Sequence, residues 1–364
     1  MNTSKIINLQ ELKNFDSVIE QSVSLLRQGG LVVLPTETVY GIAALASNES
    51  AVKRLIEVKG RREGHALPLA IGSYEMLSEY IPAPGILGQR LARRCWPGPL
   101  TLVFDGTVAD SQFARYPQEI RKAIMPEGTV GLRVPSCPIT QEILLELGEP
   151  IALSSANISG ENPAITAEEA AARLGGKVDL VLDAGESDLK KPSTVVKVET
   201  DSLEILREGA ITSDTIEKLT AKIILFVCTG NTCRSPMAEA YLQYISDKNG
   251  LGISAFSAGL SAFEGDFTSE NAIAALSGAG INAEMKPARR FTAQSGSQAD
   301  KIYVMTEQHL DFIKMRFPEY ENKTSLLGEA IPDPFGKTEE AYKECLNQMI
   351  KYINCLFTGE GFGE

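Results

Sequence analysis

Strand-like and helix-like stretches alternate in regular order from residue 222 to residue 357, and this alternation restricts the fold more than any other feature of the chain. Each apolar stretch of strand length precedes a stretch with helical spacing, in the order KIILFVC, SPMAEAYLQYISDK, ISAFSAG, SENAIAALSGAG, KIYVM, EQHLDFIKMRF, TSLL and EEAYKECLNQMIKYINCLF. This order is typical of parallel strands joined by helices. We therefore predict a doubly wound, parallel four-stranded sheet with flanking helices, and functional side chains beyond the carboxyl ends of its strands.

The first part of the chain contains the same two kinds of segment in a looser order. Strand-like runs occupy residues 31–35, 101–104, 130–134, 150–154, 179–183, 193–198 and 203–207. Helical spacing occupies residues 15–27, 49–58, 85–94, 138–147 and 166–174, with a short closing helix in 211–222. Because 364 residues exceed the size at which one core keeps growing, we predict two α/β domains. Residues 1–215 would hold a twisted mixed sheet, and residues 222–364 the parallel sheet.

The overall charge and the scarcity of histidine exclude several kinds of site. A formal net charge of -12 disfavours direct binding to a nucleic-acid backbone, because that requires a basic face. No apolar run is long enough to cross a bilayer and the first residues lack a signal peptide's core, so we expect a cytoplasmic protein with no membrane partner. With 2 histidines and no zinc-type cysteine pair, we expect no metal site made by the protein alone. Neither GxxxxGK[ST] nor GxGxxG occurs, so any nucleotide must be held in another way.

The stretch CTGNTCRSP, residues 228–236, has the chemistry of a phosphate-binding loop. Cys228 ends a predicted strand, and the serine and proline that close the stretch are favoured where a helix begins. Gly230 and Asn231 tolerate left-handed backbone, so successive N–H groups can face an anion. The positive helix end and the guanidinium of Arg234 favour a phosphate and a thiolate alike, which makes Cys228 a candidate nucleophile.

Over residues 222–357 the chain resembles the low-molecular-weight protein-tyrosine phosphatase family, whose loop CTGNTCRS matches throughout. The resemblance implies that Cys228 attacks phosphorus, that Arg234 holds the phosphoryl group and that Asp333 is the general acid. It also implies a phosphocysteine intermediate, phosphorylated proteins as substrates, and no cofactor for this half. The other residues that it assigns are Thr229, Gly230, Asn231, Thr232, Cys233 and Ser235 in the phosphate loop, and Phe335 in the substrate pocket.

Two residues look more like the protein-arginine phosphatase branch of this family. Tyrosine phosphatases usually have an aliphatic residue where this chain has Thr232, and a tyrosine or tryptophan where it has Phe335. A hydroxyl at position 232 can orient water or a phosphoramidate nitrogen, so we favour phosphoarginine as the substrate, with phosphotyrosine as the alternative. Cys233 has two interpretations of equal weight: a reversible disulfide with Cys228, which the family likeness suggests, or simple packing beneath the loop.

The first half contains short motifs whose joint order is more informative than any one of them: PTETVYG, KGR, WPGPLTLV, GLRVP, SSANISG, PSTVV and ILREG. Over roughly residues 10–215 this order resembles the YrdC/Sua5 family, whose signature is KxR followed far downstream by SxN. The resemblance implies synthesis of threonylcarbamoyl-AMP from L-threonine, bicarbonate and ATP, with Mg2+ accompanying the nucleotide. The product serves the t6A modification of tRNA, and transfer to tRNA would belong to partner proteins.

The matching motifs assign residues to two subsites. Nucleotide binding falls to Lys59, Arg61, Ser155, Asn157 and Arg207, and threonine binding to Thr36, Arg133 and Ser193. Positive side chains would then replace the missing phosphate-binding glycine loop. Two departures from the family stand out: Pro192 precedes Ser193 where some synthases have glutamate, and the phosphatase-like half replaces the extra domain of longer Sua5 proteins.

The sequence favours a bifunctional enzyme, with a synthase joined to an arginine phosphatase. The alternative is a phosphotyrosine phosphatase whose first half senses a nucleotide or an amino acid without catalysis.

Overall fold

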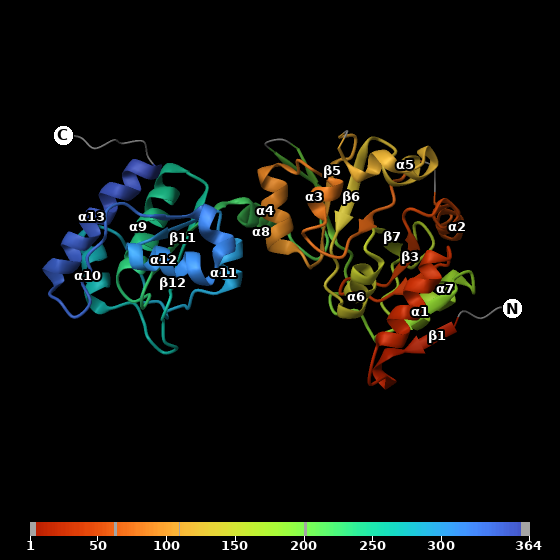
Figure 1. The fold of residues 1–364 in the computed structure, drawn as a ribbon, viewed down its shortest axis with the longest axis horizontal. Helices are drawn as coiled ribbons and strands as arrows, with labels where there is room; N and C mark the ends of the chain where they lie inside the picture. Colours follow the sequence, from red (N-terminus) through yellow and green to blue (C-terminus); the bar gives the residue numbers. More distant parts are fainter. Residues whose placement is uncertain (1–4, 62–63, 109, 200–201, 358–364) are drawn as a thin grey trace. The chain divides into compact units, whose positions relative to one another are not determined.

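The computed structural model describes residues 5–61, 64–108, 110–199 and 202–357. The chain divides into two compact units, Met1–Thr220 and Ala221–Glu364, whose elements are labelled in Figure 1. Helix α8, Ser213–Thr220, belongs to the first unit, where its Ile216 is buried in the core. None of the helices in the described ranges is long and apolar enough to cross a bilayer.

A mixed sheet forms the centre of the first unit, as predicted, and it has ten strands. Its spatial order is β1-β8-β2-β3-β7-β4-β6-β5-β9-β10. The strands are β1 Lys5–Asn8, β2 Val32–Leu34, β3 Gly41–Leu45, β4 Leu69–Ala70, β5 Leu100–Asp105, β6 Thr129–Arg133, β7 Ile151–Ser155, β8 Leu180–Asp183, β9 Thr194–Val198 and β10 Leu203–Arg207. Both kinds of pairing occur, since β2 lies parallel to β8 and antiparallel to β3.

Three of these strands, β1, β3 and β4, were not among the predicted ones. All five residues of β3 are buried, so the strand lacks the alternation of apolar and polar residues that reveals a strand with one wet face. Strand β4 has only two residues, and β1 lies at the edge of the sheet and is partly exposed. These strands could not be predicted from the sequence because β3 lacks an alternating pattern, β4 is too short and β1 lies at the sheet edge.

Helices cover both faces of the ten-stranded sheet. Along β2, Val33 faces one hydrophobic core while Val32 and Leu34 face the other. Helices α1 and α6 pack on the second of these faces, and α2, α4, α5, α7 and α8 on the first. The helices are α1 Asp16–Arg27, α2 Glu49–Lys59, α3 Leu77–Tyr80, α4 Gly85–Cys95, α5 Gln118–Ile124, α6 Pro138–Leu147 and α7 Ala167–Leu174, besides α8; short 3-10 turns occupy Leu9–Glu11 and Gln112–Arg115.

The second unit contains the predicted parallel sheet of four strands, in the order β12-β11-β13-β14. The strands are β11 Lys222–Cys228, β12 Ile253–Gly259, β13 Lys301–Val304 and β14 Thr324–Leu326. After β11 the next strand, β12, lies on one side of it, and the strands that follow, β13 and β14, lie on its other side. The crevice at the carboxyl end of β11 is thus the point where a doubly wound sheet binds its ligands.

Helices also cover both faces of this smaller sheet (Figure 1). Along β11, Ile224, Phe226 and Cys228 face the core under α9, α10 and α13, and the alternate residues face α11 and α12. These helices are α9 Arg234–Asn249, α10 Glu270–Gly278, α11 Ala293–Gln298, α12 Glu307–Arg316 and α13 Glu339–Phe357; a 3-10 segment occupies Pro318–Lys323.

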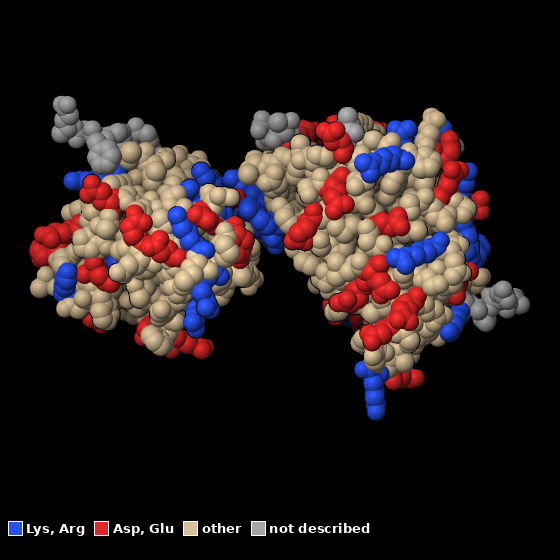
Figure 2. Space-filling model, viewed as in Figure 1, with Lys and Arg blue, Asp and Glu red and all other residues tan. Residues whose placement is uncertain are grey.

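Lys, Arg, Asp and Glu side chains mix on the face of the molecule shown in Figure 2. Red and blue side chains occur on both units in this view, in keeping with 47 acidic and 35 basic residues in the whole chain.

Gly259, the last residue of β12, lets the backbone of the loop after β11 come close. A Cβ at this position would lie 2.6 Å from the carbonyl oxygen of Thr229 and 2.8 Å from the amide nitrogen of Asn231. Because both neighbours are backbone atoms, we expect Gly259→Ala to lower the free energy of unfolding by about 1–3 kcal/mol. Thermal and urea unfolding would measure the change.

Gly278, the last residue of α10, provides a matched control, since the only atom a Cβ there would meet is Lys343 Cε at 3.9 Å. Gly278→Ala should leave stability unchanged or slightly raised, because alanine favours helix. Equal stability of the two variants would contradict the close approach of backbone at Gly259.

Candidate active sites

Seven of the eight side chains predicted for the first unit line one cavity of about 340 Å3. Three of them lie at the ends of strands: Arg133 ends β6, Ser155 ends β7 and Arg207 ends β10. The others are Thr36, Arg61, Asn157 and Ser193. Residues spread over more than 170 positions of the chain therefore meet at one place.

Lys59, the eighth, lies beneath this cavity and is only 2% exposed. Gly60 ends α2 in the left-handed conformation, with φ of 57°, which turns the chain so that Lys59 and Arg61 both face the cavity region. Lys59 Nζ donates to the carbonyl oxygen of Ser155 at 2.5 Å. Burial, with a smaller effect of the nearby charge of Arg61, lowers the pKa of Lys59 to about 8.

The three arginines of the cavity are each held in place by fixed acceptors. Arg61 donates to the carbonyl oxygens of His65 at 3.0 Å and Ala66 at 2.5 Å. Arg133 forms an ion pair with Glu37 at 2.7 Å, in which both side chains are nearly buried. Arg207 Nη2 donates to the Ser193 carbonyl oxygen at 2.8 Å. Such multiple contacts fix the guanidinium planes before any ligand arrives.

The cavity has a local excess of positive charge. Among the described residues, its lining contains three arginines and a single carboxylate, that of Glu161. Burial lowers the pKa of both Arg61 and Arg207, and for Arg207 the charge of Arg133 adds to the effect. Desolvated cations that repel one another would be stabilised by an anion with several charges. The arrangement is suited to a phosphate-bearing ligand.

Two polar groups at this site were not among the predicted residues. Thr101 Oγ1 lies 2.9 Å from Ser193 Oγ, and the side chain of Glu37 orients Arg133. Thr101 belongs to the motif WPGPLTLV and Glu37 to the motif PTETVYG. The sequence does not indicate which side chain each of them contacts. Asn157 Oδ1 is buried and has no hydrogen-bond partner among the described residues, so it is available to a ligand or a water molecule.

The predicted phosphate loop of the second unit runs between the end of β11 and the start of α9. Asn231 takes the left-handed conformation with φ of 57°, and its amide nitrogen lies 3.3 Å from Cys228 Sγ. Ser235 Oγ lies 3.0 Å from the same sulfur. The loop therefore turns hydrogen-bond donors toward Cys228, which suits a sulfur anion and a bound phosphate.

Arg234 and Asp333 meet across this site although 99 positions separate them. Arg234 is 5% exposed, and its Nη2 lies 2.5 Å from Asp333 Oδ2. Its Nε is buried without a hydrogen-bond partner among the described residues, so part of the guanidinium remains available to a ligand. Asp333 also accepts from the amide of Phe335 at 3.1 Å, which shapes the Asp-Pro-Phe turn.

A cavity of about 460 Å3 opens over Cys228 and Arg234. Its mouth is aromatic, because Phe263, Phe267 and Phe335 all line it and Phe263 and Phe335 are more than 70% exposed. Asp266 is a second carboxylate in the lining besides Asp333. Phe335 was predicted from the sequence, whereas the loop 260–268 was not, because its role depends on its position in space.

His309 and Tyr342 were also missed, and both hold residues of the loop. Thr229 Oγ1 lies 2.9 Å from His309 Nε2, and Cys233 Sγ lies 3.1 Å from Tyr342 Oη. Burial, with the charge of Arg234, lowers the pKa of His309 to about 4, so its ring is neutral near pH 7. Cys233 packs against α13 beneath the loop.

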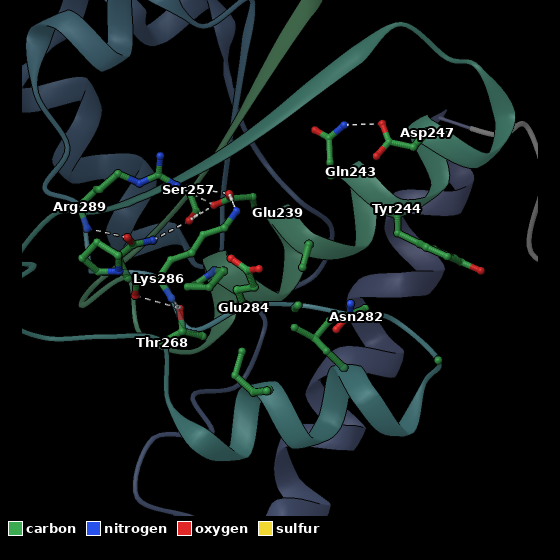
Figure 3. A pocket seen from close by; sticks show the side chains of 18 residues that line it. Glu239, Gln243, Tyr244, Asp247, Ser257, Thr268, Asn282, Glu284, Lys286 and Arg289 are labelled. Atoms are coloured by element: carbon green, nitrogen blue, oxygen red, sulfur yellow. Dashed lines mark hydrogen bonds and ion pairs between the residues drawn. The ribbon is translucent and has the colours of Figure 1, made fainter.

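A second cavity of about 450 Å3 lies on the other side of the loop (Figure 3). Here Asn231 Nδ2 donates to Ser257 Oγ at 2.8 Å, and Ser257 donates to the buried Glu239 at 2.5 Å. The amide of Arg289 donates to Asn231 Oδ1 at 2.7 Å. These bonds fix the Asn231 side chain and stabilise the left-handed backbone of the loop.

Two family models match the chain. The Sua5/YciO/YrdC model, described as "Telomere recombination", matches residues 24–209, half of the chain, and the low-molecular-weight phosphotyrosine protein phosphatase model matches residues 223–359. The threonylcarbamoyl-AMP synthase of Pyrococcus abyssi is 36% identical over 221 residues, which are 60% of this chain and 61% of that protein. The chain thus spans less than two thirds of this relative.

Solved structures resemble each unit. A double variant of Pyrococcus abyssi Sua5 is 29% identical, covers 76% of this chain and 89% of its own, and has a TM-score of 0.54. The YwlE arginine phosphatase from Geobacillus stearothermophilus is 36% identical and covers 38% of this chain and 92% of its own, with a TM-score of 0.36. Both matched families are families of enzymes. The chain therefore belongs to the Sua5/YrdC family through residues 24–209 and joins to it, over residues 223–359, a domain of the low-molecular-weight protein phosphatase family.

Proposed function

We propose that the chain is a bifunctional cytoplasmic enzyme. The first unit makes L-threonylcarbamoyl-AMP from L-threonine, bicarbonate and ATP for the t6A modification of tRNA, and the second removes phosphate from phosphoarginine in proteins. The observation that carries the first activity is the gathering of seven predicted side chains around one cation-rich cavity with Lys59 beneath it. Transfer of the product to tRNA would fall to partner proteins.

In the synthase reaction, the buried cations receive the triphosphate. Arg61 and Lys59 would neutralise charge that builds up on the phosphates, while Arg133 and Ser193 hold threonine through its carboxylate and hydroxyl. An oxygen of the threonine carbamate attacks the α-phosphorus, a P–O bond forms, and pyrophosphate leaves with the electrons of the bond that breaks. Mg2+ would enter with the triphosphate, because the described part of the chain brings no three His, Cys, Asp or Glu side chains together as ligands.

In the phosphatase reaction, Cys228 Sγ attacks phosphorus and the bond to the leaving nitrogen breaks. The loop amides and Arg234 hold the phosphoryl oxygens, and Asp333 protonates the leaving guanidine nitrogen. Water then attacks the phosphocysteine, gives its proton to Asp333 and releases phosphate. Asp333 pairs with Arg234 in the free enzyme, so the carboxyl must exchange this partner for the leaving group when substrate binds.

The mouth of the phosphatase cavity favours phosphoarginine over phosphotyrosine. A guanidinium is flat and positively charged, so it can stack on the exposed rings of Phe263 and Phe335 and donate to the Asp266 carboxylate. The phenyl ring of phosphotyrosine offers no donor to Asp266. Thr232 lines the same cavity with its hydroxyl 3.4 Å from Cys233 Sγ, where it can accept from the leaving nitrogen or orient water.

Paired assays on one preparation test the two activities. We expect pyrophosphate release from ATP that requires both L-threonine and bicarbonate, and release of phosphate from a phosphoarginine peptide that Cys228→Ser abolishes. ATP binding without any threonine-dependent pyrophosphate release would overturn the synthase and leave a nucleotide sensor. Hydrolysis of phosphotyrosine in preference to phosphoarginine would overturn the proposed substrate.

The pKa of Lys59 predicts how ATP affinity changes with pH. Because this pKa is about 8 in the folded protein, below the ordinary lysine value of 10.5, the ammonium is present below pH 8 and is lost as the pH rises through it. We expect ATP affinity to fall roughly tenfold between about pH 7 and about pH 9, since bonds to charged groups contribute about 1.5–3 kcal/mol. Calorimetry at several pH values measures this.

Lys59→Met should bind ATP weakly at every pH and show a flatter profile. Lys53→Met is the matched control, because Lys53 lies on the same helix, is exposed and pairs with Glu49. An unchanged pH profile in Lys59→Met would show that this ammonium does not contact the nucleotide.

Thr232 is expected to determine the choice between the two phosphatase substrates. Thr232→Ile removes the hydroxyl and adds apolar bulk, so kcat/KM for a phosphoarginine peptide should fall at least about tenfold while that for phosphotyrosine holds or rises. Ser261→Ala, which removes a hydroxyl elsewhere in the cavity lining, should change the ratio little. If the ratio stays the same in Thr232→Ile, the assignment of Thr232 fails.

A further inference from the structure

The cavity behind the phosphate loop is elongated along α9. Pro236, Glu239, Gln243 and Asp247 lie on successive turns of this helix, and all of them line the cavity. At 1.5 Å per residue, the distance along the helix from Glu239 to Asp247 is about 12 Å. Figure 3 shows the result: Glu239 and Arg289 lie at one end of the cavity and Asp247 at the other.

The end near the phosphate loop carries two cations and two carboxylates. Glu239, 4% exposed, pairs with Lys286 at 2.8 Å and with Arg289 at 3.1 Å, while both cationic side chains remain about half exposed. Both cations can still bind an anion from the cavity side through their exposed parts, while the two carboxylates leave this end without net charge. Glu284 lines the same end beside Lys286 (Figure 3) and makes no ion pair among the described residues.

The far end is negative, and the middle is apolar. Asp247 lies there, with Tyr244 on the same helix. Between the two ends the walls are formed by aliphatic side chains, those of Ala240, Ile273, Leu276 and Ala283. A ligand that fits needs charged groups at both ends and an apolar stem between them.

We propose that this cavity binds a free basic α-amino acid such as L-arginine or L-lysine. Its α-carboxylate would contact Lys286 and Arg289, its α-ammonium Glu284, its methylene chain the aliphatic walls, and its terminal cation Asp247. The charges agree, because the five ionised side chains of the lining sum to -1 and a basic amino acid carries +1. The volume of about 450 Å3 is within the range of small-molecule sites.

Occupancy of this cavity is coupled to the catalytic loop by direct contacts. Asn231 belongs both to the cavity lining and to the phosphate loop, and its side chain bonds to Ser257 and Ser235. Glu239 completes the chain, since it accepts from Ser257 and from the two cations that would bind the ligand carboxylate. A ligand that binds these cations changes the electrostatic environment of Glu239. Its effect can pass to the loop through the hydrogen bonds from Ser257 to Glu239 and from Asn231 to Ser257.

Calorimetric titration of the full chain with a series of amino acids tests the proposal. L-Arginine and L-lysine carry both ends of the ligand, norleucine lacks the terminal cation, and agmatine lacks the carboxylate. We expect norleucine and agmatine to bind roughly tenfold more weakly than arginine, because each loses a charged hydrogen-bonding partner. Equal affinity across the series, or no binding of arginine and lysine, would overturn the proposal.

Variants locate the site within the chain, which also has a cavity in its first unit. Asp247→Asn keeps the acceptor for Gln243 and removes the charge, and Lys286→Met leaves Glu239 paired with Arg289. Each should weaken arginine binding roughly tenfold.

Lys343→Met is the control, because Lys343 lies on α13 outside the cavity; this variant should bind arginine as the unaltered chain does. Hydrolysis of p-nitrophenyl phosphate confirms that the Asp247→Asn protein is folded. Arginine affinity that is the same in Asp247→Asn and in the unaltered chain would place the ligand elsewhere.

Discussion

Burial of a positive charge determines the chemistry of both units. Lys59 and Arg234 are 2% and 5% exposed, and moving a cation out of water costs free energy unless an anion or several acceptors compensate. The two units meet this cost in different ways. Among the described residues, Lys59 has only the carbonyl and hydroxyl of Ser155 as acceptors, and burial lowers its pKa to about 8, whereas Arg234 pairs with the Asp333 carboxylate. The first site is therefore incomplete without an anion, and the second keeps its candidate acid in place.

Backbone geometry makes both arrangements attainable. In the first unit, the left-handed Gly60 ends α2 and separates Lys59 from Arg61, so that one lies below the cavity and the other in its wall. In the second, Asn231 takes up the left-handed position of the loop, and Gly259 leaves room for the loop backbone beside β12. An asparagine in this conformation is costly, and four hydrogen bonds compensate the cost: three that its amide and side-chain nitrogen donate, and one that its side-chain oxygen accepts.

The sequence revealed the parts of the sites that are contiguous or repeat a known motif. The loop from Cys228 to Ser235 could be identified because its strand, turn and helix start lie within a few positions, and the alternation after residue 222 predicted the sheet. The partners that come from elsewhere in the chain could not be found in this way. His309 and Asp266 carry no local signal, because a histidine at the start of a helix and an aspartate in a loop are ordinary in sequence. Their roles arise only when β13 and the loop 260–268 lie beside β11.

The net charge of -12 and the cation-rich cavity of the first unit are compatible because they act over different distances. Repulsion between the acidic surface and a triphosphate is screened beyond about 8 Å at physiological ionic strength. The three arginines line the cavity and Lys59 lies buried beneath it, where such charges would interact with an anion far more strongly than in bulk water. Under the proposed function, association with an anionic nucleotide would thus depend on these local side chains rather than on long-range attraction. If the phosphatase unit acts on phosphoarginine as proposed, the net negative charge of the chain would instead favour binding, because it attracts the basic segments of proteins in which arginine occurs.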